Sequence, residues 1–402
     1  MKKLFVIISS FVLLSGLIVG GNSSRGENFS SLVNGNNQTA IDLYGKLSYK
    51  NKGNVFFSPF SISTAFGMTY AGARGKTENE MATILHFTLP QKELHPAFSI
   101  LIKKINAKNK PYELTIANAL WGQRGYHFLK EFKELINKYY GGGFYEVNFK
   151  TDSEGTRKKI NTWVEEKTNQ KIKDLISRGD INYLTRLVLT NAIYFKGRWA
   201  SKFNEKNTKP APFYILPDKK IEVSMMFQEG KFPYYENENL KVLELPYAGN
   251  DLSMVVFLPS KKNGLDSLEK ELTLKKIKLW VSKMYKRKVK VYLPKFKAKT
   301  KYYLGNILSS MGMADAFSYE ADFSGMTGGK ELKISKVIHQ AYIDVNEEGT
   351  EAAGATGIVM ELKALPKPSP VFNADHPFVF LIVHKKTGSI LFIGRIANPS
   401  KK

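Results

Sequence analysis

The stretch from residue 346 to residue 370 is the part of the chain whose residue types could take part in chemistry. It lies between two apolar segments, has no stable pattern of its own, and is long for a connection inside a compact domain, which usually indicates a function. Its first half alternates: extended, it would carry its charges (Glu351, Glu361 and Lys363) on one face only. The uncharged face would carry Thr350, Ala352, Gly354, Thr356, Ile358, Met360 and Leu362. The stretch is therefore suited both to an exposed loop and to a strand with one buried side.

The second half of this stretch has the features of a protease substrate. Three prolines lack the amide donor that a central strand needs, so any pairing in a sheet should stop before residue 366. The basic residues after Glu351 are Lys363 and Lys367, and Lys367 precedes a proline, where trypsin-like proteases cut poorly. The bond between Lys363 and Ala364 is therefore the expected cleavage site for a trypsin-like protease. The prolines are Pro366, Pro368 and Pro370.

Residues that would make the chain an enzyme do not form a recognisable site. The chain has no cysteine, which excludes disulfides, thiol catalysis and zinc–thiolate sites. Its six histidines lack metal-ligand spacing, and no Gly-x-Ser-x-Gly motif is present. The run from Gly72 to Thr77 looks like part of a phosphate-binding loop, but Tyr70 stands where the motif needs its first glycine. We expect no enzymatic activity, no cofactor and no metal.

The strongly basic composition raises the question of an acidic partner. The formal net charge is +24, but the lysines are spread along the whole chain, and local runs such as Lys286–Lys290 are modest. There is no arginine-rich arm, helix-turn-helix or zinc pattern, so specific nucleic-acid binding is not expected. A solvated basic surface is the favoured interpretation, and weak polyanion binding is the alternative.

The N-terminus has the pattern of a signal peptide. Lys2 and Lys3 precede an apolar run from Leu4 to Val19, and small residues follow it. The run is short for a membrane span, which makes an anchor the less favoured alternative. We predict a signal peptide at residues 1–21, a flexible Ser-, Asn- and Gly-rich leader at residues 22–36, and a secreted protein, extracellular or periplasmic. A brief basic start and export without disulfides are typical of a bacterial protein.

The elements that must position the stretch at 346–370 point to one domain over residues 37–400. Apolar residues at helical spacing predict helices over residues 37–49, 61–71, 128–140, 153–177 and 302–311. Alternating or continuous apolar runs predict strands over residues 54–57, 113–121, 187–196, 242–258 (two strands), 289–296, 332–345, 378–384 and 390–396. Helices dominate early and strands late, without a long linker or a repeat, so the expected fold class is α+β with antiparallel sheets.

Several motifs together resemble the serpin family of serine protease inhibitors. The resemblance extends over Asn37–Pro399, and its most specific part is the alanine-rich run that begins at Glu347. That run resembles the hinge of inhibitory serpins and comprises Glu347, Glu348, Gly349, Thr350, Glu351, Ala352, Ala353, Gly354, Ala355 and Thr356. The other matching motifs are Asn54–Ser63, Leu189–Trp199, Phe372–Phe378 and Phe392–Pro399.

The resemblance implies a fold and a mechanism. It implies three mainly antiparallel β-sheets, eight or nine helices and an exposed reactive-centre loop at about 347–371. A protease would cut the loop once, the loop would insert into the main sheet, and the acyl-enzyme would be trapped. Trp199 would lie where the loop enters the sheet, and His339 on the neighbouring strand, both as structural residues that control sheet opening. The implied partner is a serine protease in a covalent complex with a monomeric inhibitor.

Two matters stay open at this point. Spacing from the hinge also places the scissile bond at Lys363–Ala364, but the loop is a few residues longer than in typical members, so cleavage after Leu362 or Met360 by other proteases is the alternative. The rival to inhibition is a non-inhibitory serpin that acts as a chaperone, a carrier or a polyanion-binding surface protein. Such members tend to have bulky or charged hinge residues, unlike this hinge.

Overall fold

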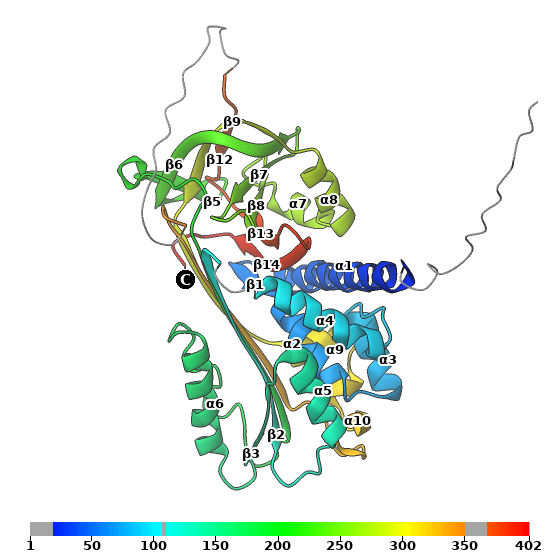
Figure 1. The fold of residues 1–402 in the computed structure, drawn as a ribbon. Helices are drawn as coiled ribbons and strands as arrows, with labels where there is room; N and C mark the ends of the chain where they lie inside the picture. Colours follow the sequence, from blue (N-terminus) through cyan, green and yellow to red (C-terminus); the bar gives the residue numbers. More distant parts are fainter. Residues whose placement is uncertain (1–18, 107–109, 350–367, 402) are drawn as a thin grey trace, which may run out of the picture.

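The computed structural model describes residues 19–106, 110–349 and 368–401 and builds them around two β-sheets (Figure 1). The first sheet has five strands, and its central strands are long and largely buried. In spatial order they are β10 (Phe296–Tyr303), β11 (Lys336–Val345), β4 (Leu187–Gly197), β2 (Tyr112–Gln123) and β3 (Phe144–Val147). Strands β11 and β4 are parallel neighbours, as are β2 and β3, whereas the other two pairs are antiparallel.

The second sheet has nine strands, and most neighbouring strands in it are antiparallel. Its strands in spatial order are β1 (Val55–Phe57), β14 (Ser389–Ile396), β13 (Phe378–His384), β8 (Leu252–Pro259), β7 (Leu240–Pro246), β6 (Lys219–Glu236), β9 (Tyr285–Pro294) and β12 (Val371–Asn373), with β5 (Lys209–Leu216) also paired to β6. The 18-residue strand β6 joins β5, β7 and β9 into one hydrogen-bonded network. Two of the three expected sheets are thus continuous here, because β6 is long enough to belong to both.

Helices cover both faces of the five-stranded sheet (Figure 1). On one face α6 (Ser153–Lys167) encloses a separate apolar cluster that includes Trp121, Ile160 and Ile338. On the other face α2 (Pro59–Tyr70), which is buried along its whole length, packs in the main core. The remaining helices are α1 (Val19–Lys50), α3 (Gly75–Ile84), α4 (Gln91–Ile105), α5 (Lys130–Tyr140), α7 (Leu265–Glu271), α8 (Leu274–Ser282), α9 (Leu304–Met311) and α10 (Ser324–Thr327), with short 3-10 turns η1 (Glu205–Asn207) and η2 (Asp315–Phe317).

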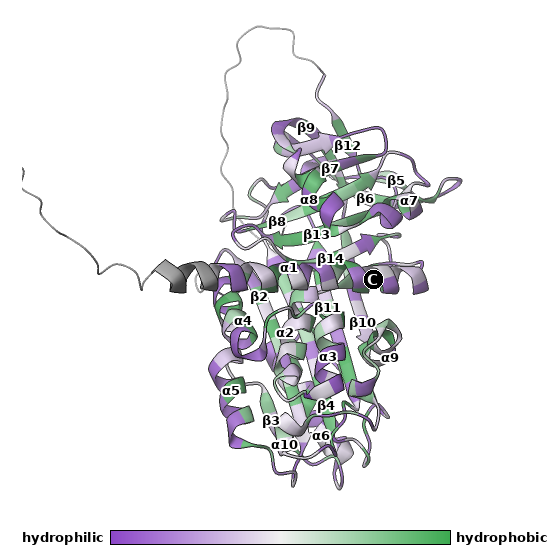
Figure 2. Ribbon diagram, turned by 90° about the vertical axis from the view of Figure 1, so that its right-hand side faces the viewer, coloured by the Kyte–Doolittle hydropathy of each residue, from purple (hydrophilic) through white to green (hydrophobic). Residues whose placement is uncertain are grey.

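The hydropathy of the ribbon follows this layering, with hydrophobic segments in the strands and polar ones on the outer helices (Figure 2). No helix in the part of the chain that the structure describes is long and apolar enough to cross a membrane. The α+β fold class is confirmed. The described residues contain ten α-helices, against eight or nine expected, and the shortest of them has only four residues.

Two predicted segments differ from the structure. The prediction of a flexible leader at residues 22–36 is wrong, because α1 begins at Val19, and Leu32 and Val33 are buried in the core. Their apolar spacing continues that of Leu43 and Leu47 and was obscured by the Ser- and Asn-rich composition. The predicted cleavage after residue 21 would fall inside α1. The helix predicted over residues 153–177 ends at Lys167, and Asn169 and Gln170 then turn the chain away with positive φ angles.

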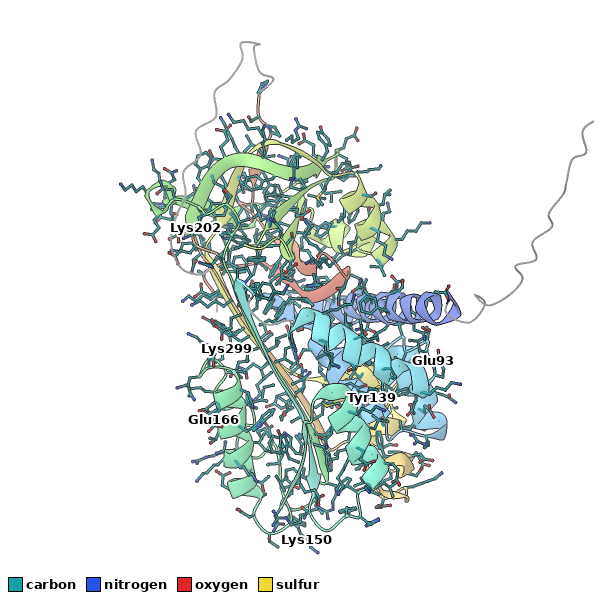
Figure 3. The ribbon with its side chains drawn as sticks, viewed as in Figure 1. Glu93, Tyr139, Lys150, Glu166, Lys202 and Lys299 are labelled. Atoms are coloured by element: carbon teal, nitrogen blue, oxygen red, sulfur yellow. The ribbon has the colours of Figure 1, made fainter. Side chains whose placement is uncertain are left out.

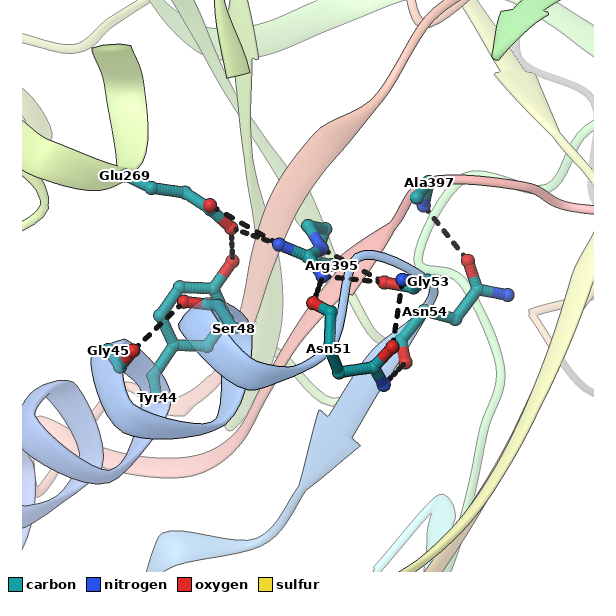
Figure 4. A network of polar contacts seen from close by, with 9 residues as sticks. All are labelled: Tyr44, Gly45, Ser48, Asn51, Gly53, Asn54, Glu269, Arg395 and Ala397. Atoms are coloured by element: carbon teal, nitrogen blue, oxygen red, sulfur yellow. Dashed lines mark hydrogen bonds and ion pairs between the residues drawn. The ribbon is translucent and has the colours of Figure 1, made fainter. Parts of the chain in front are cut away.

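The last strand is tied to the first helix by a buried polar network (Figure 4). Arg395 on β14 is almost fully buried and pairs with Glu269 on α7 at 2.9 Å. The hydroxyl of Tyr44 on α1 donates to the same carboxylate at 2.6 Å, and Arg395 also donates to the carbonyls of Asn51 and Gly53. A buried guanidinium needs such a full set of partners. The network therefore fixes the carboxyl end of the chain against α1 and α7.

Candidate functional site

The base of the candidate loop is a tight turn at the end of β11. The amide of Gly349 donates to the carbonyl of Asn346 at 3.1 Å, and the amide of Glu348 donates to the Asn346 side chain at 3.1 Å. Gly349 has a φ of +77°, and a Cβ there would collide with the backbone of Trp199. Only glycine fits this position without strain. The chain is therefore turned back at the point where the described residues end.

Trp199 lies directly beside this turn. Its indole Nε1 donates to the carbonyl of Asn346 at 3.0 Å, and its backbone amide donates to the carbonyl of Glu348 at 3.0 Å. The ring stacks on Tyr247, with 4.6 Å between ring centroids. The structure thus places Trp199 at the junction between β4, the strand that it follows, and the start of the loop.

Glu347 anchors the turn to the nine-stranded sheet. Its side chain is only 7% exposed and accepts from the Thr208 hydroxyl at 2.7 Å and from Lys295 Nζ at 2.8 Å. Its carbonyl accepts from the amide of Phe203 at 2.9 Å. Burial alone would raise the pKa of Glu347, but the bonds from Lys295 and Thr208 outweigh it and hold the pKa below its usual value. Glu347 is therefore a charged anchor, which sequence reasoning placed in the hinge without its partners.

The other end of the loop is held by β9 and β7. The amide of Lys290 on β9 donates to the carbonyl of Pro370 at 2.9 Å, and β12 then runs parallel to β9. Lys241 Nζ on β7 donates to the carbonyl of Val371 at 2.9 Å. The segment between Gly349 and Pro368 is thus tethered at both of its ends.

A line of polar side chains crosses the middle of the five-stranded sheet. Tyr302, His339, Asn191 and Asn118 lie directly opposite one another on β10, β11, β4 and β2. His339 Nδ1 bonds to Asn191 Oδ1, and the amide of Ser58 donates to His339 Nε2 at 3.2 Å. Because Nε2 accepts, Nδ1 carries the proton and the ring is neutral. The bond from His339 to Asn191 crosses the boundary between β11 and β4.

Burial determines the charge state of His339. The side chain is fully buried, and desolvation lowers its pKa to about 3. Asn191 also donates to Ser61 Oγ at 2.7 Å and to Asn118 Oδ1. The cluster is thus internally satisfied, and separating β4 from β11 requires its central bond to break. Sequence reasoning found His339 but missed Asn191, Asn118 and Ser58, since only the register of three distant strands brings them together.

The remaining predicted site residues lie outside the described residues. These are the hinge residues Thr350, Glu351, Ala352, Ala353, Gly354, Ala355 and Thr356 and the cleavage candidates Met360, Leu362, Lys363 and Ala364. Within the described ranges no group of three or more His, Asp or Glu side chains could hold a metal ion. What the structure provides is a fixed anchor on each side of this segment, at Glu347 and at Pro370, and the parallel pair of strands β4 and β11.

Comparison with known proteins places this arrangement in one class. The family model for serpins, described as serine protease inhibitors, matches residues 34–399, and the chain belongs to the serpin family. Leukocyte elastase inhibitor of Bos taurus is 45% identical over 373 residues, which cover 90% of this chain and 98% of the relative. Serpin B3 of Homo sapiens is 40% identical over 389 residues, covering 92% and 100%. The crystal structure of maspin superimposes with a TM-score of 0.87 at 31% identity, covering 93% of this chain and all of that chain.

These findings confirm the predicted serpin fold, and membership of a family described as serine protease inhibitors supports the prediction that the protein is not an enzyme. They contradict the prediction of a secreted protein. The bovine relative aligns over 98% of its own length and serpin B3 over all of it, yet about a tenth of this chain has no counterpart in the bovine protein. These relatives thus carry nothing equivalent to a signal peptide before the domain, and the prediction of extracellular or periplasmic localisation is wrong.

Proposed function

We propose that the protein inhibits serine proteases as a suicide substrate, by inserting residues 350–362 between β4 and β11 after a single cut. The observation that carries the proposal is the topology of these two strands. They are parallel neighbours, paired from Lys336 opposite Val188 to Ile343 opposite Phe195, and the loop leaves the carboxyl end of β11. A strand that turned back from this end would run antiparallel to both. One parallel ladder would be replaced by two antiparallel ladders, which are slightly more stable per residue.

The burial pattern of β11 supports this insertion. Val345, Ile343 and Ala341 face the main core, whereas Ile338 faces the cluster under α6. A turn over residues 346–349 would set Thr350 opposite Val345, so the uncharged face of the loop would meet the main core. Small residues come first on this face, which lets the strands part with little steric cost.

The proposed chemistry uses only the serine of the protease and the backbone of the loop. The serine hydroxyl attacks the carbonyl carbon of Lys363, the amide bond to Ala364 breaks, and the new amine of Ala364 leaves with the proton. The carbonyl of Lys363 is then esterified to the protease. Insertion of the freed segment would carry the ester and its protease along the sheet before water can hydrolyse it. Lys363 would fill an acidic specificity pocket, which makes the target trypsin-like.

A second target class is favoured by the names of the relatives. Leukocyte elastase inhibitors are named for a protease other than trypsin, and this loop has apolar residues just before Lys363. Such a protease could cut after Leu362 or Met360 and be trapped by the same insertion mechanism. The inserted segment would then be one or three residues shorter.

The test is a panel of trypsin-like, elastase-like and chymotrypsin-like proteases incubated with the full chain. We expect an SDS-stable complex with at least one of them, and mass spectrometry of the released C-terminal peptide identifies the scissile bond. The cleaved form should also melt at a higher temperature than the intact form. Clean cleavage without a complex, and without a rise in melting temperature, would instead support a non-inhibitory serpin.

Weak polyanion binding is a separate proposal that rests on the net charge of +24. Basic side chains project from distant parts of the surface, as Lys150, Lys202 and Lys299 illustrate (Figure 3). Retention on a heparin resin in 0.15 M salt, where the Debye length is about 8 Å, would support it. Elution below that salt concentration would leave only a solvated basic surface.

A further inference from the structure

A row of exposed lysines lies on one face of β9 and β6. On β9, Lys286, Lys288 and Lys290 alternate with residues that turn toward the other face of the sheet, including the buried Val289. Lys231 on β6 is also exposed and lies directly opposite Lys288. We call these four residues (Lys231, Lys286, Lys288 and Lys290) the basic row. Over β9 alone it extends for about 13 Å at the rise of an extended strand.

The basic row is poorly neutralised. Glu229, which lies opposite Lys290, pairs with Lys288 at 3.6 Å. Among the residues that the structure describes, no ion pair involves Lys231, Lys286 or Lys290. Lys231 and Lys288 are like charges directly across the strands, an arrangement that disfavours pairing. The sheet therefore gains no evident stability from this concentration of charge.

The row lies next to the carboxyl end of the candidate loop. Val371 at the start of β12 pairs with Lys290, whose amide holds the carbonyl of Pro370. Strands β9 and β12 lie together at one end of the molecule in both views (Figures 1 and 2). Pro370 is six positions after Ala364 in the sequence, a span of at most roughly 22 Å when extended. A protease bound across Lys363–Ala364 would bring its own surface within reach of the row.

We propose that the basic row is an auxiliary docking surface for an acidic patch on the protease, on the side where the residues after the scissile bond are bound. The inference rests on the proposed function, because it needs a protease at the loop. Edge protection explains some lysines on β9, since only Lys290, Val291 and Tyr292 of this strand pair with β12. At Lys231 strand β6 pairs with β9 alone, so edge protection applies there as well. It does not explain why the charge is concentrated beside the loop.

The test compares two trypsins with the same preference for lysine, one anionic and one cationic. The measured quantity is the second-order rate constant for consumption of the intact inhibitor, counted as complex plus cleaved chain. This rate reports docking whether or not a cut leads to a complex. The row variant carries Lys231→Gln, Lys286→Gln, Lys288→Gln and Lys290→Gln. The control variant, with the same change in net charge on α4, α5 and α6, carries Lys92→Gln, Lys103→Gln, Lys138→Gln and Lys158→Gln.

We expect the parent to react faster with the anionic trypsin at low salt. With the anionic trypsin, the rate of the row variant should be about 10-fold lower than that of the parent, which is the lower end of the range for electrostatic steering. The rate of the control variant should change less than about 2-fold. The difference should vanish near 1 M salt, where the Debye length is about 3 Å. The ratio of the rate with the anionic trypsin to the rate with the cationic trypsin should be lower in the row variant than in the control variant. An equal ratio in the two variants would overturn the inference.

The outcomes separate this inference from the proposed function. If the intact chain is consumed only by cleavage, without an SDS-stable complex, inhibition by insertion is refuted. The rates of consumption still test whether the basic row contributes to docking. If the row variant elutes earlier than the control from a heparin resin but matches it in both rates, the row binds polyanions and the proposed docking role is wrong. If neither trypsin cuts the parent, the row has no trypsin to contact and the inference fails with the proposed target.

Discussion

The neutral, buried His339 should make the stability of the protein depend on pH. Its pKa is about 3 in the folded protein because burial disfavours the imidazolium, whereas an unfolded histidine has a pKa near 6.5. Below pH 6.5 the unfolded chain therefore binds a proton that the folded chain does not. The contribution of His339 to stability is complete above pH 6.5 and is lost progressively as the pH falls toward 3.

The size of the effect follows from these two pKa values. Between pH 7.5 and pH 5.0, the linkage relation gives a loss of about 2 kcal/mol from this one group. His339→Gln should remove this loss, because a glutamine amide can accept from the Ser58 amide and donate to Asn191 without a titratable group. Carboxylates and the other histidines are unchanged in the variant, so their contributions cancel in the comparison.

Urea unfolding of the parent and the variant at both pH values measures this difference. We expect the parent to lose about 2 kcal/mol more free energy of unfolding than His339→Gln over this interval. His127→Gln, a change at an exposed histidine, should behave like the parent. The ring resonances of His339 in NMR spectra of the folded parent should not titrate between pH 7.5 and 5.0. An equal pH dependence in parent and variant, or a resonance that titrates near pH 6.5, would refute the reasoning.

Three further predictions concern the loop and its supports. Thr350→Arg should abolish the SDS-stable complex while cleavage continues, because the first inserted side chain would bury a charge, whereas Glu351→Arg on the charged face should retain the complex in the same gel assay. Arg395→Ala should lower the free energy of unfolding by about 3–5 kcal/mol, since it leaves Glu269 without its guanidinium; a urea midpoint close to that of Lys401→Ala would contradict the described network. Trp199→Phe should keep the ring stacking but lose the indole hydrogen bond to Asn346, lowering the stability of the intact form by about 1 kcal/mol in thermal melts. An unchanged melting temperature would mean that this bond does not hold the turn.

The sequence predicts the elements that carry strong local patterns. The continuous apolar run at residues 187–196 and the hairpin at residues 378–396 match β4, β13 and β14 closely. The segment over residues 22–36 was missed because its polar composition outweighs a few apolar positions at helical spacing. The helix predicted over residues 153–177 continued too far for a different reason, since the apolar residues after Lys167 pack under the sheet without helical backbone.

The candidate site is only partly visible in the sequence. The alanine-rich hinge is a local pattern, and family resemblance supplies Trp199 and His339. The partners of Glu347 are not local, since Thr208 and Lys295 reach it only through the folded sheets. The basic row did leave a signal, because lysines at every second position from 286 to 290 alternate with residues on the other face of the sheet. That alternation becomes informative only when the position of β9 beside the loop is known.

The position of β14 has a consequence for how the chain is made. This strand contains residues 389–396, yet it lies between β1 and β13, and Arg395 pairs with Val55 some 340 residues earlier. A ribosome that has released the first helices must still synthesise nearly the whole polypeptide before that gap can be filled. Contacts of such long sequence separation are slow to form. Until its final residues emerge, the nascent chain therefore exposes apolar surface beside β1, which makes this the stage at which a chaperone would be most useful.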